Sequence, residues 1–112
     1  MVWTVSTSPN PSLTLSKSSA ALPVRNGGFF TTVSSNGASN PIIWGIATDP
    51  TGTKINLLAF DPETGNTTTP MTQLFSAQVG TWQTGRAFLI PAVQNGRVFV
   101  VSYAQLAIFG LN

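Results

Sequence analysis

Three carboxylates, Asp49, Asp61 and Glu63, are the acidic side chains of this 112-residue chain, and they are its natural candidates for acid–base catalysis or for binding a hard metal ion. The chain has no His and no Cys, so zinc sites of the Cys/His type and His-based nucleophilic triads are excluded within it. Asp61 and Glu63 lie two residues apart in a Pro-Gly turn, whereas a calcium loop needs several more oxygen ligands at regular spacing. We therefore expect Asp61 to cap its own turn, and we predict no catalytic residue, no metal site and no cofactor.

Aromatic side chains could instead stack on a sugar or a quinone. Trp44 and Phe99 lie in the middle of apolar runs, which favours packing in a core. Trp82 differs because it lies in the polar stretch 79–85, where its indole could contact a ligand or a partner. Packing against a neighbouring structural unit is the competing interpretation of Trp82. Trp82 is the one candidate contact residue that the sequence offers.

Charge gives little indication of a partner. Only 7% of the residues are charged, and the five cations are far apart in the sequence. Binding of nucleic acid requires a basic cluster or stripe, so no nucleic-acid partner is predicted.

The elements that would position these side chains are β-strands. No stretch shows apolar residues at helical spacing over three turns, and Gly, Pro and Thr interrupt every candidate. Short runs of Val, Ile, Phe and Trp between turn residues indicate strands. The predicted strands are 2–6, 12–17, 29–34, 41–48, 54–61, 72–79, 86–93, 97–103 and 105–110.

One pattern of strands and turns occurs twice. An Asn-Gly pair precedes an apolar strand and then a second apolar strand, first in 35–60 and again in 94–110. Such a repeat marks units that bury their apolar faces by stacking on one another. The runs Ile42–Trp44 and Val98–Val101 are apolar at consecutive positions, which predicts sheets that are covered on both faces. Small antiparallel sheets stacked in this way are the blades of a β-propeller.

The same residues resemble a known family. Residues 29–37, 42–46 and 58–65 are similar to one blade of the quinoprotein-type (pyrroloquinoline-quinone-like) β-propeller repeat, and residues 90–100 and 106–111 are similar to its terminal blade. The Trp that often closes such a repeat is missing after Asp61–Gly65, where Leu74-Phe75 stands instead. In an enzyme of this family, the resemblance would imply a bound quinone and calcium.

The resemblance predicts an organisation of about two four-stranded antiparallel blades. Residues 1–28 would be the last strands of a preceding blade and a crossing loop, 29–79 a complete blade, and 80–112 a partial terminal blade. A propeller needs four to eight blades to close, so we expect a fragment of a larger propeller. The open sheet edges predict that its partners are other blades of the parent chain or further copies of itself, as a homo-oligomer.

Compartment follows from composition and from the first residues. The polar surface is rich in Ser, Thr and Asn, which favours a secreted or periplasmic protein. Residues 1–6 lack a signal peptide, which predicts either a cytoplasmic protein or a piece of a longer, already targeted chain, and we expect the second. No apolar run approaches the roughly 18 residues of a membrane-spanning helix.

Together these observations predict a non-catalytic β-propeller fragment that serves as a structural or protein-interaction scaffold. Two alternatives stay open. One is part of a quinoprotein dehydrogenase whose active site lies in blades outside this chain. The other is a carbohydrate-binding module that uses Trp82 and the Asn/Thr loops.

Overall fold

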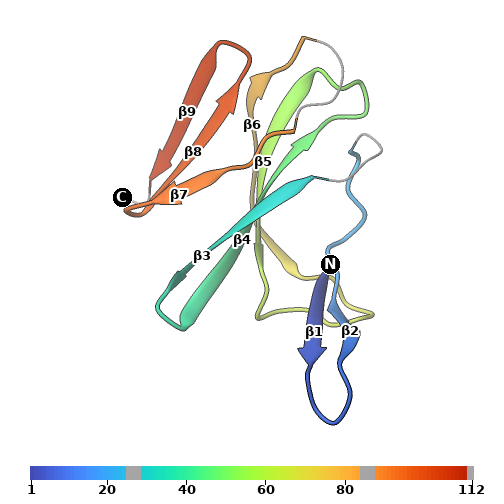
Figure 1. The fold of residues 1–112 in the computed structure, drawn as a ribbon. Helices are drawn as coiled ribbons and strands as arrows, with labels where there is room; N and C mark the ends of the chain where they lie inside the picture. Colours follow the sequence, from blue (N-terminus) through green and yellow to red (C-terminus); the bar gives the residue numbers. More distant parts are fainter. Residues whose placement is uncertain (25–28, 84–87, 111–112) are drawn as a thin grey trace.

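The computed structural model describes residues 1–24, 29–83 and 88–110, and these residues form strands and turns without a helix (Figure 1). Antiparallel pairing groups the strands into three sheets, which we call A, B and C in chain order. Sheet A contains β1 (Val2–Ser6) and β2 (Ser12–Lys17). Sheet B contains β3 (Phe30–Asn36), β4 (Ser39–Thr48), β5 (Lys54–Asp61) and β6 (Thr72–Thr81). Sheet C contains β7 (Ala92–Gln94), β8 (Arg97–Ser102) and β9 (Gln105–Gly110).

These strands confirm the all-β, antiparallel fold class and, with one exception, the predicted strand positions. The exception is the seventh strand, which was expected over 86–93 but is only the three residues Ala92–Gln94. Pro91 directly precedes it, and a proline has no N–H to donate to a strand ladder. Residues 84–87 lie outside the described residues.

Turn residues close the hairpins of sheets B and C. Asn95 and Gly96 have φ angles of 50° and 69° between β7 and β8, which is the left-handed geometry of a two-residue hairpin turn. Between β3 and β4 the two-residue turn is Gly37-Ala38, because Asn36 still pairs with Ser39, and Gly37 has a φ of 60°. The short β8–β9 connection contains Ala104 at a φ of 51°, although alanine lacks the freedom of glycine there. The two Asn-Gly pairs thus occupy equivalent hairpins.

The main core lies between sheet B and sheet C. Ile46, Ile55 and Leu57 of sheet B meet Val98 and Val100 of sheet C, and all five are buried. The rings of Phe75 and Phe109 cross this interface edge to face, with centroids 5.6 Å apart. Sheet C therefore stacks on sheet B through one apolar face of each sheet.

A second, smaller core lies on the opposite face of sheet B. Its buried members are Ala47, Leu58 and Phe60, and they are covered by Leu22 and Val24 of the segment 18–24 and by Phe29. We call residues 18–24 the strap. The Phe29 ring lies so close to Gly45 that a Cβ at this position would be 2.5 Å from its Cε2 atom. The strands at the centre of sheet B are thus covered on both faces.

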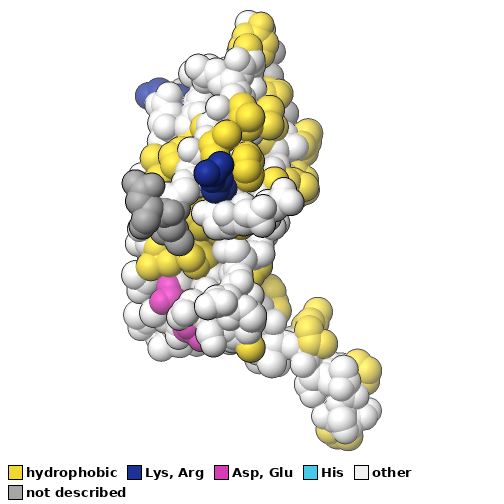
Figure 2. Space-filling model, turned by 90° about the vertical axis from the view of Figure 1, so that its left-hand side faces the viewer, with side chains coloured by type: hydrophobic (Ala, Val, Ile, Leu, Met, Phe, Trp, Pro, Cys, Tyr) yellow, Lys and Arg dark blue, Asp and Glu magenta, His cyan; other side chains and the backbone are white. Residues whose placement is uncertain are grey.

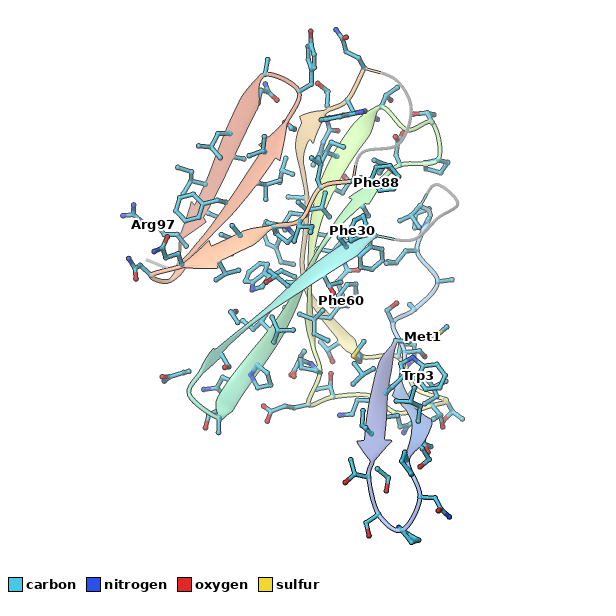
Figure 3. All side chains as sticks on the ribbon, in the orientation of Figure 1. Met1, Trp3, Phe30, Phe60, Phe88 and Arg97 are labelled. Atoms are coloured by element: carbon cyan, nitrogen blue, oxygen red, sulfur yellow. The ribbon has the colours of Figure 1, made fainter. Side chains whose placement is uncertain are left out.

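Sheet A is a separate hairpin that projects from the rest of the molecule (Figures 1 and 2). Its base is held by two hydrogen bonds to the 62–71 loop: Lys17 Nζ donates to the Pro62 carbonyl at 2.6 Å, and Met71 N–H donates to the Ser18 carbonyl at 2.8 Å. Pairing places Trp3 opposite Leu15 and Val5 opposite Leu13, so four apolar side chains share one face of the hairpin. Trp3 is 51% exposed on this arm (Figure 3).

Candidate interaction surface

Asp49 serves the turn between β4 and β5. Its carboxylate accepts hydrogen bonds from the backbone N–H groups of Thr53 and Lys54, both at 2.9 Å, and from the Thr51 hydroxyl at 2.6 Å. These bonds favour the ionised form, with the Lys54 N–H contributing most, and they lower the pKa of Asp49 to about 2. A carboxylate with so low a pKa is a poor general base near neutral pH.

Asp61 serves the turn after β5 in the same way. Its Oδ1 atom accepts the Glu63 N–H at 2.8 Å, and its backbone carbonyl accepts the Thr64 hydroxyl at 2.9 Å. The expectation that Asp61 caps its own turn is therefore confirmed. In the described residues, no three His, Cys, Asp or Glu side chains lie close enough together to hold a metal ion.

Trp82 follows directly after β6 and is half-buried. Its side chain packs against the core cluster between sheets B and C, as the partly buried Leu89 also does. Its backbone N–H donates to the Thr53 carbonyl at 2.7 Å, which extends the pairing of β5 with β6 by one residue. This position agrees with packing against a neighbouring unit, and a ligand or partner contact through the exposed part of the indole stays a prediction.

A second exposed apolar surface, besides that of sheet A, is the outer face of sheet C, which sequence reasoning did not single out. Strand register pairs Phe99 with Ile108 and Val101 with Leu106, so these four side chains lie on the face turned away from sheet B. Val101, Leu106 and Ile108 are 58%, 59% and 52% exposed. Ala92 pairs with Phe99 and extends the same face onto β7. We define the outer face by these residues: Ala92, Phe99, Val101, Leu106 and Ile108.

The charge on the outer face is confined to one end. Arg97 begins β8 and is exposed beside Gln94, its partner in the register with β7 (Figure 3). No acidic side chain occurs on β7, β8 or β9. Figure 2 shows apolar side chains over this part of the molecule, seen from the side on which β9 lies in Figure 1. The surface is thus an apolar sheet face with a single cation at its end.

Four residues of this face, those on β8 and β9, have counterparts in sheet B that are buried or partly buried. Trp44 pairs with Ala59 and Ile46 pairs with Leu57, just as Phe99 pairs with Ile108 and Val101 with Leu106. Ile46, Leu57 and Ala59 are buried, and Trp44 packs on the same core. The prediction that both apolar runs are covered on both faces is therefore correct for sheet B and wrong for sheet C in the described residues. Sheet C lacks a third layer, because nothing in the described chain stacks on its outer face.

The signal for this surface is present in the repeat. Phe99 aligns with Trp44, and Trp44 in sheet B is covered by the next sheet of the stack. In the described residues no further sheet stacks on sheet C, so the corresponding face of sheet C is exposed.

In the described residues no helix is long and apolar enough to cross a membrane. Comparison of the chain with known protein families, with curated proteins and with solved structures finds no match.

Proposed function

We propose that this chain is a non-catalytic module of the β-propeller type, part of a larger propeller, that serves as a structural or protein-interaction scaffold. The observation that carries the proposal is the stacking of sheet C on sheet B, because each of these two sheets contains one copy of the sequence repeat. Repeat proteins of this kind bury their cores between neighbouring units.

The partners in this proposal are further sheets of the same kind, from other blades of the parent chain or from other copies of this chain. Two features support this choice. The outer face of sheet C is apolar and exposed, and sheet A is a two-stranded hairpin whose apolar side chains are also exposed. A two-stranded hairpin alone is only marginally stable in water, so it gains stability from a covering sheet. A Ser-, Thr- and Asn-rich surface fits a secreted or periplasmic setting for such a scaffold.

The quinoprotein alternative places its active site in blades outside this chain, and the carboxylates of this chain bear only on whether they could add to such a site. Calcium requires several oxygen ligands converging on one point. The Asp49 and Asp61 carboxylates each bind N–H groups of their own turn, and they come from opposite ends of strand β5. In the described residues the acidic side chains are not gathered into a calcium site, which is compatible with both the scaffold and an active site in other blades.

A calorimetric titration tests the proposal. Pyrroloquinoline quinone is titrated, with calcium present, into the 112-residue protein, and dye reduction with alcohols and sugars is measured in parallel. We expect no heat beyond dilution and no turnover. Micromolar quinone binding that is abolished in Asp61→Ala but kept in Glu63→Gln would overturn the assignment as a non-catalytic scaffold, because it would show that the Asp61 turn is a ligand site.

A further inference from the structure

We propose that Asn66 is an acceptor site for an N-linked glycan. The sequence Asn66-Thr67-Thr68 has the acceptor pattern, in which an asparagine is followed two positions later by Ser or Thr, with a residue other than proline between them. The inference rests on the secreted setting named in the proposed function, because this modification occurs on exported chains.

The first argument is the place of Asn66 in the fold. It lies in the 62–71 loop that connects β5 to β6, and every residue from 66 to 70 is exposed. A glycan is bulky and solubilising, so its attachment site must face solvent. A sugar on Asn66 would extend away from the loop without displacing a buried side chain.

The second argument is the chemistry of the acceptor. The donor is an oligosaccharide carried on a lipid pyrophosphate, and a transferase joins its C1 atom to Nδ2 of the asparagine. The bond between C1 and the pyrophosphate oxygen breaks as the Nδ2–C1 bond forms. One Nδ2 proton passes to a base of the transferase, and the lipid pyrophosphate leaves. Thr68 supplies the hydroxyl that the pattern requires two residues after the asparagine.

The competing explanation for Asn66 is that it only shapes its own loop. Its Oδ1 atom accepts the N–H groups of Thr68 and Thr69, both at 2.8 Å, and the Thr68 hydroxyl at 2.9 Å. Its backbone N–H donates to the Thr69 carbonyl at 2.8 Å. Asparagine is common in turns for such bonds. None of these bonds involves Nδ2, and a glycosylated amide keeps its Oδ1, so the turn and the glycan are compatible.

The chain also contains an internal comparison. Asn10 is followed two positions later by Ser12, and it is exposed in the connection between β1 and β2. Pro11 lies between the two residues, which excludes the site from the acceptor pattern. We therefore expect Asn10 to stay unmodified although it is as accessible as Asn66.

Secretion from a eukaryotic cell line tests the proposal. The 112-residue chain is expressed behind a cleavable secretion signal, and its peptides are analysed by mass spectrometry before and after treatment with peptide-N-glycosidase. This enzyme removes N-linked glycans and converts the acceptor asparagine to aspartate. We expect a glycan on Asn66 that the enzyme removes, and no glycan on Asn10.

Substitutions separate the glycan from the turn. Asn66→Asp keeps an acceptor oxygen for the loop but lacks Nδ2, so we expect complete loss of the glycan from a folded protein. Thr68→Val removes the hydroxyl and should also abolish the glycan, whereas Thr68→Ser keeps the hydroxyl and should keep the glycan. Pro11→Ala is the positive control, because it completes the acceptor pattern at Asn10 and should add a second glycan there.

Two outcomes would overturn the proposal. One is a secreted wild-type chain without a glycan on Asn66, and modification of Asn10 in Pro11→Ala would show that the same cells use an exposed acceptor. The other is a sugar that resists peptide-N-glycosidase and persists in Asn66→Asp, which would assign it to threonine hydroxyls. An unmodified chain that is inert in the quinone titration removes only the glycan site, whereas a glycosylated chain that binds quinone removes only the scaffold function.

Discussion

Sheets B and C are built from similar strands but differ in how they are covered. In sheet B, strand β5 is buried on both faces, by sheet C on one side and by the strap on the other. In sheet C, strand β9 has the same sequence of apolar positions, yet Leu106 and Ile108 are exposed while Ala107 and Phe109 pack inward. The local sequence is nearly the same, and the burial is different.

The difference shows that a run of consecutive apolar residues predicts a strand with an apolar side chain on both faces of its sheet. Whether each face is covered depends on which other sheets and segments pack against that sheet. Leu57 and Leu106 occupy equivalent register positions, but only Leu57 has a sheet above it. The contribution of an apolar side chain to the free energy of unfolding therefore depends on whether another layer covers it.

The largest expected difference in stability is between the truncations of Leu57 and of Leu106, which occupy equivalent positions. Leu57→Ala removes a fully buried side chain and should lower the free energy of unfolding by about 2–5 kcal/mol. Leu106→Ala removes a mostly exposed side chain and should cost less than about 0.5 kcal/mol in dilute solution, where single chains predominate. Urea denaturation of both variants measures the two values. Equal losses at high dilution would contradict the difference in burial between the sheets.

An intermediate effect on stability is expected where Gly80 of sheet B closely approaches Ser102 of sheet C. A Cβ at Gly80 of β6 would overlap both Oγ and Cβ of Ser102 on β8. Gly80→Ala should therefore cost about 1–3 kcal/mol by forcing the sheets apart. Combining it with Ser102→Gly, which removes both atoms, should restore much of the loss. Thermal denaturation measures this rescue, and its absence would mean that the sheets are not docked at this point.

Ser102→Ala is the matched control for the same contact. The Ser102 hydroxyl is buried without a hydrogen-bond partner in the described structure, so its removal should leave stability unchanged or slightly higher. The alanine keeps the Cβ, so it should rescue Gly80→Ala less well than glycine does.

The smallest expected effect concerns a hydrogen-bonded turn carboxylate, which sheet B has and sheet C lacks. The β4–β5 turn is held by the Asp49 carboxylate, whereas the β8–β9 turn of Tyr103 and Ala104 has no acidic side chain. The pKa of Asp49 falls from 3.8 to about 2 on folding, so its stabilisation is complete above about pH 4 and is lost as the pH falls towards 2. Asp49→Asn should therefore show a shallower loss of melting temperature between pH 5 and pH 2. An unchanged pH profile would contradict the role of this carboxylate.

The sequence predicted the strands because each is a short apolar run between strong turn residues. Asn95-Gly96 and Asp61-Pro62 identified hairpin ends that the structure confirms. The predicted extent of the seventh strand is wrong because Pro91 has no N–H for the strand ladder, although the residues around it are apolar.

Burial was less predictable than secondary structure. Phe99 and Trp44 look alike in sequence, and only the three-dimensional arrangement shows that Trp44 has a sheet over it and donates its Nε1–H to Ser34 Oγ at 2.9 Å. The strap was predicted only as an irregular crossing. Its role as a cover for Leu58 and Phe60 depends on long-range contacts that no local pattern reveals.

The strap also determines how the molecule responds to mechanical tension. Since the chain runs from hairpin to strap to β3, a force applied at residue 1 reaches the strap before any strand of sheet B. The pairing of β1 with β2 would separate first, then the hydrogen bonds from Lys17 to Pro62 and from Met71 to Ser18 would break, and Leu22 and Val24 would lift from Phe60. Sheets B and C would remain joined through their own core. A stretched molecule would thus expose a second apolar sheet face before any strand of sheet B or sheet C had separated.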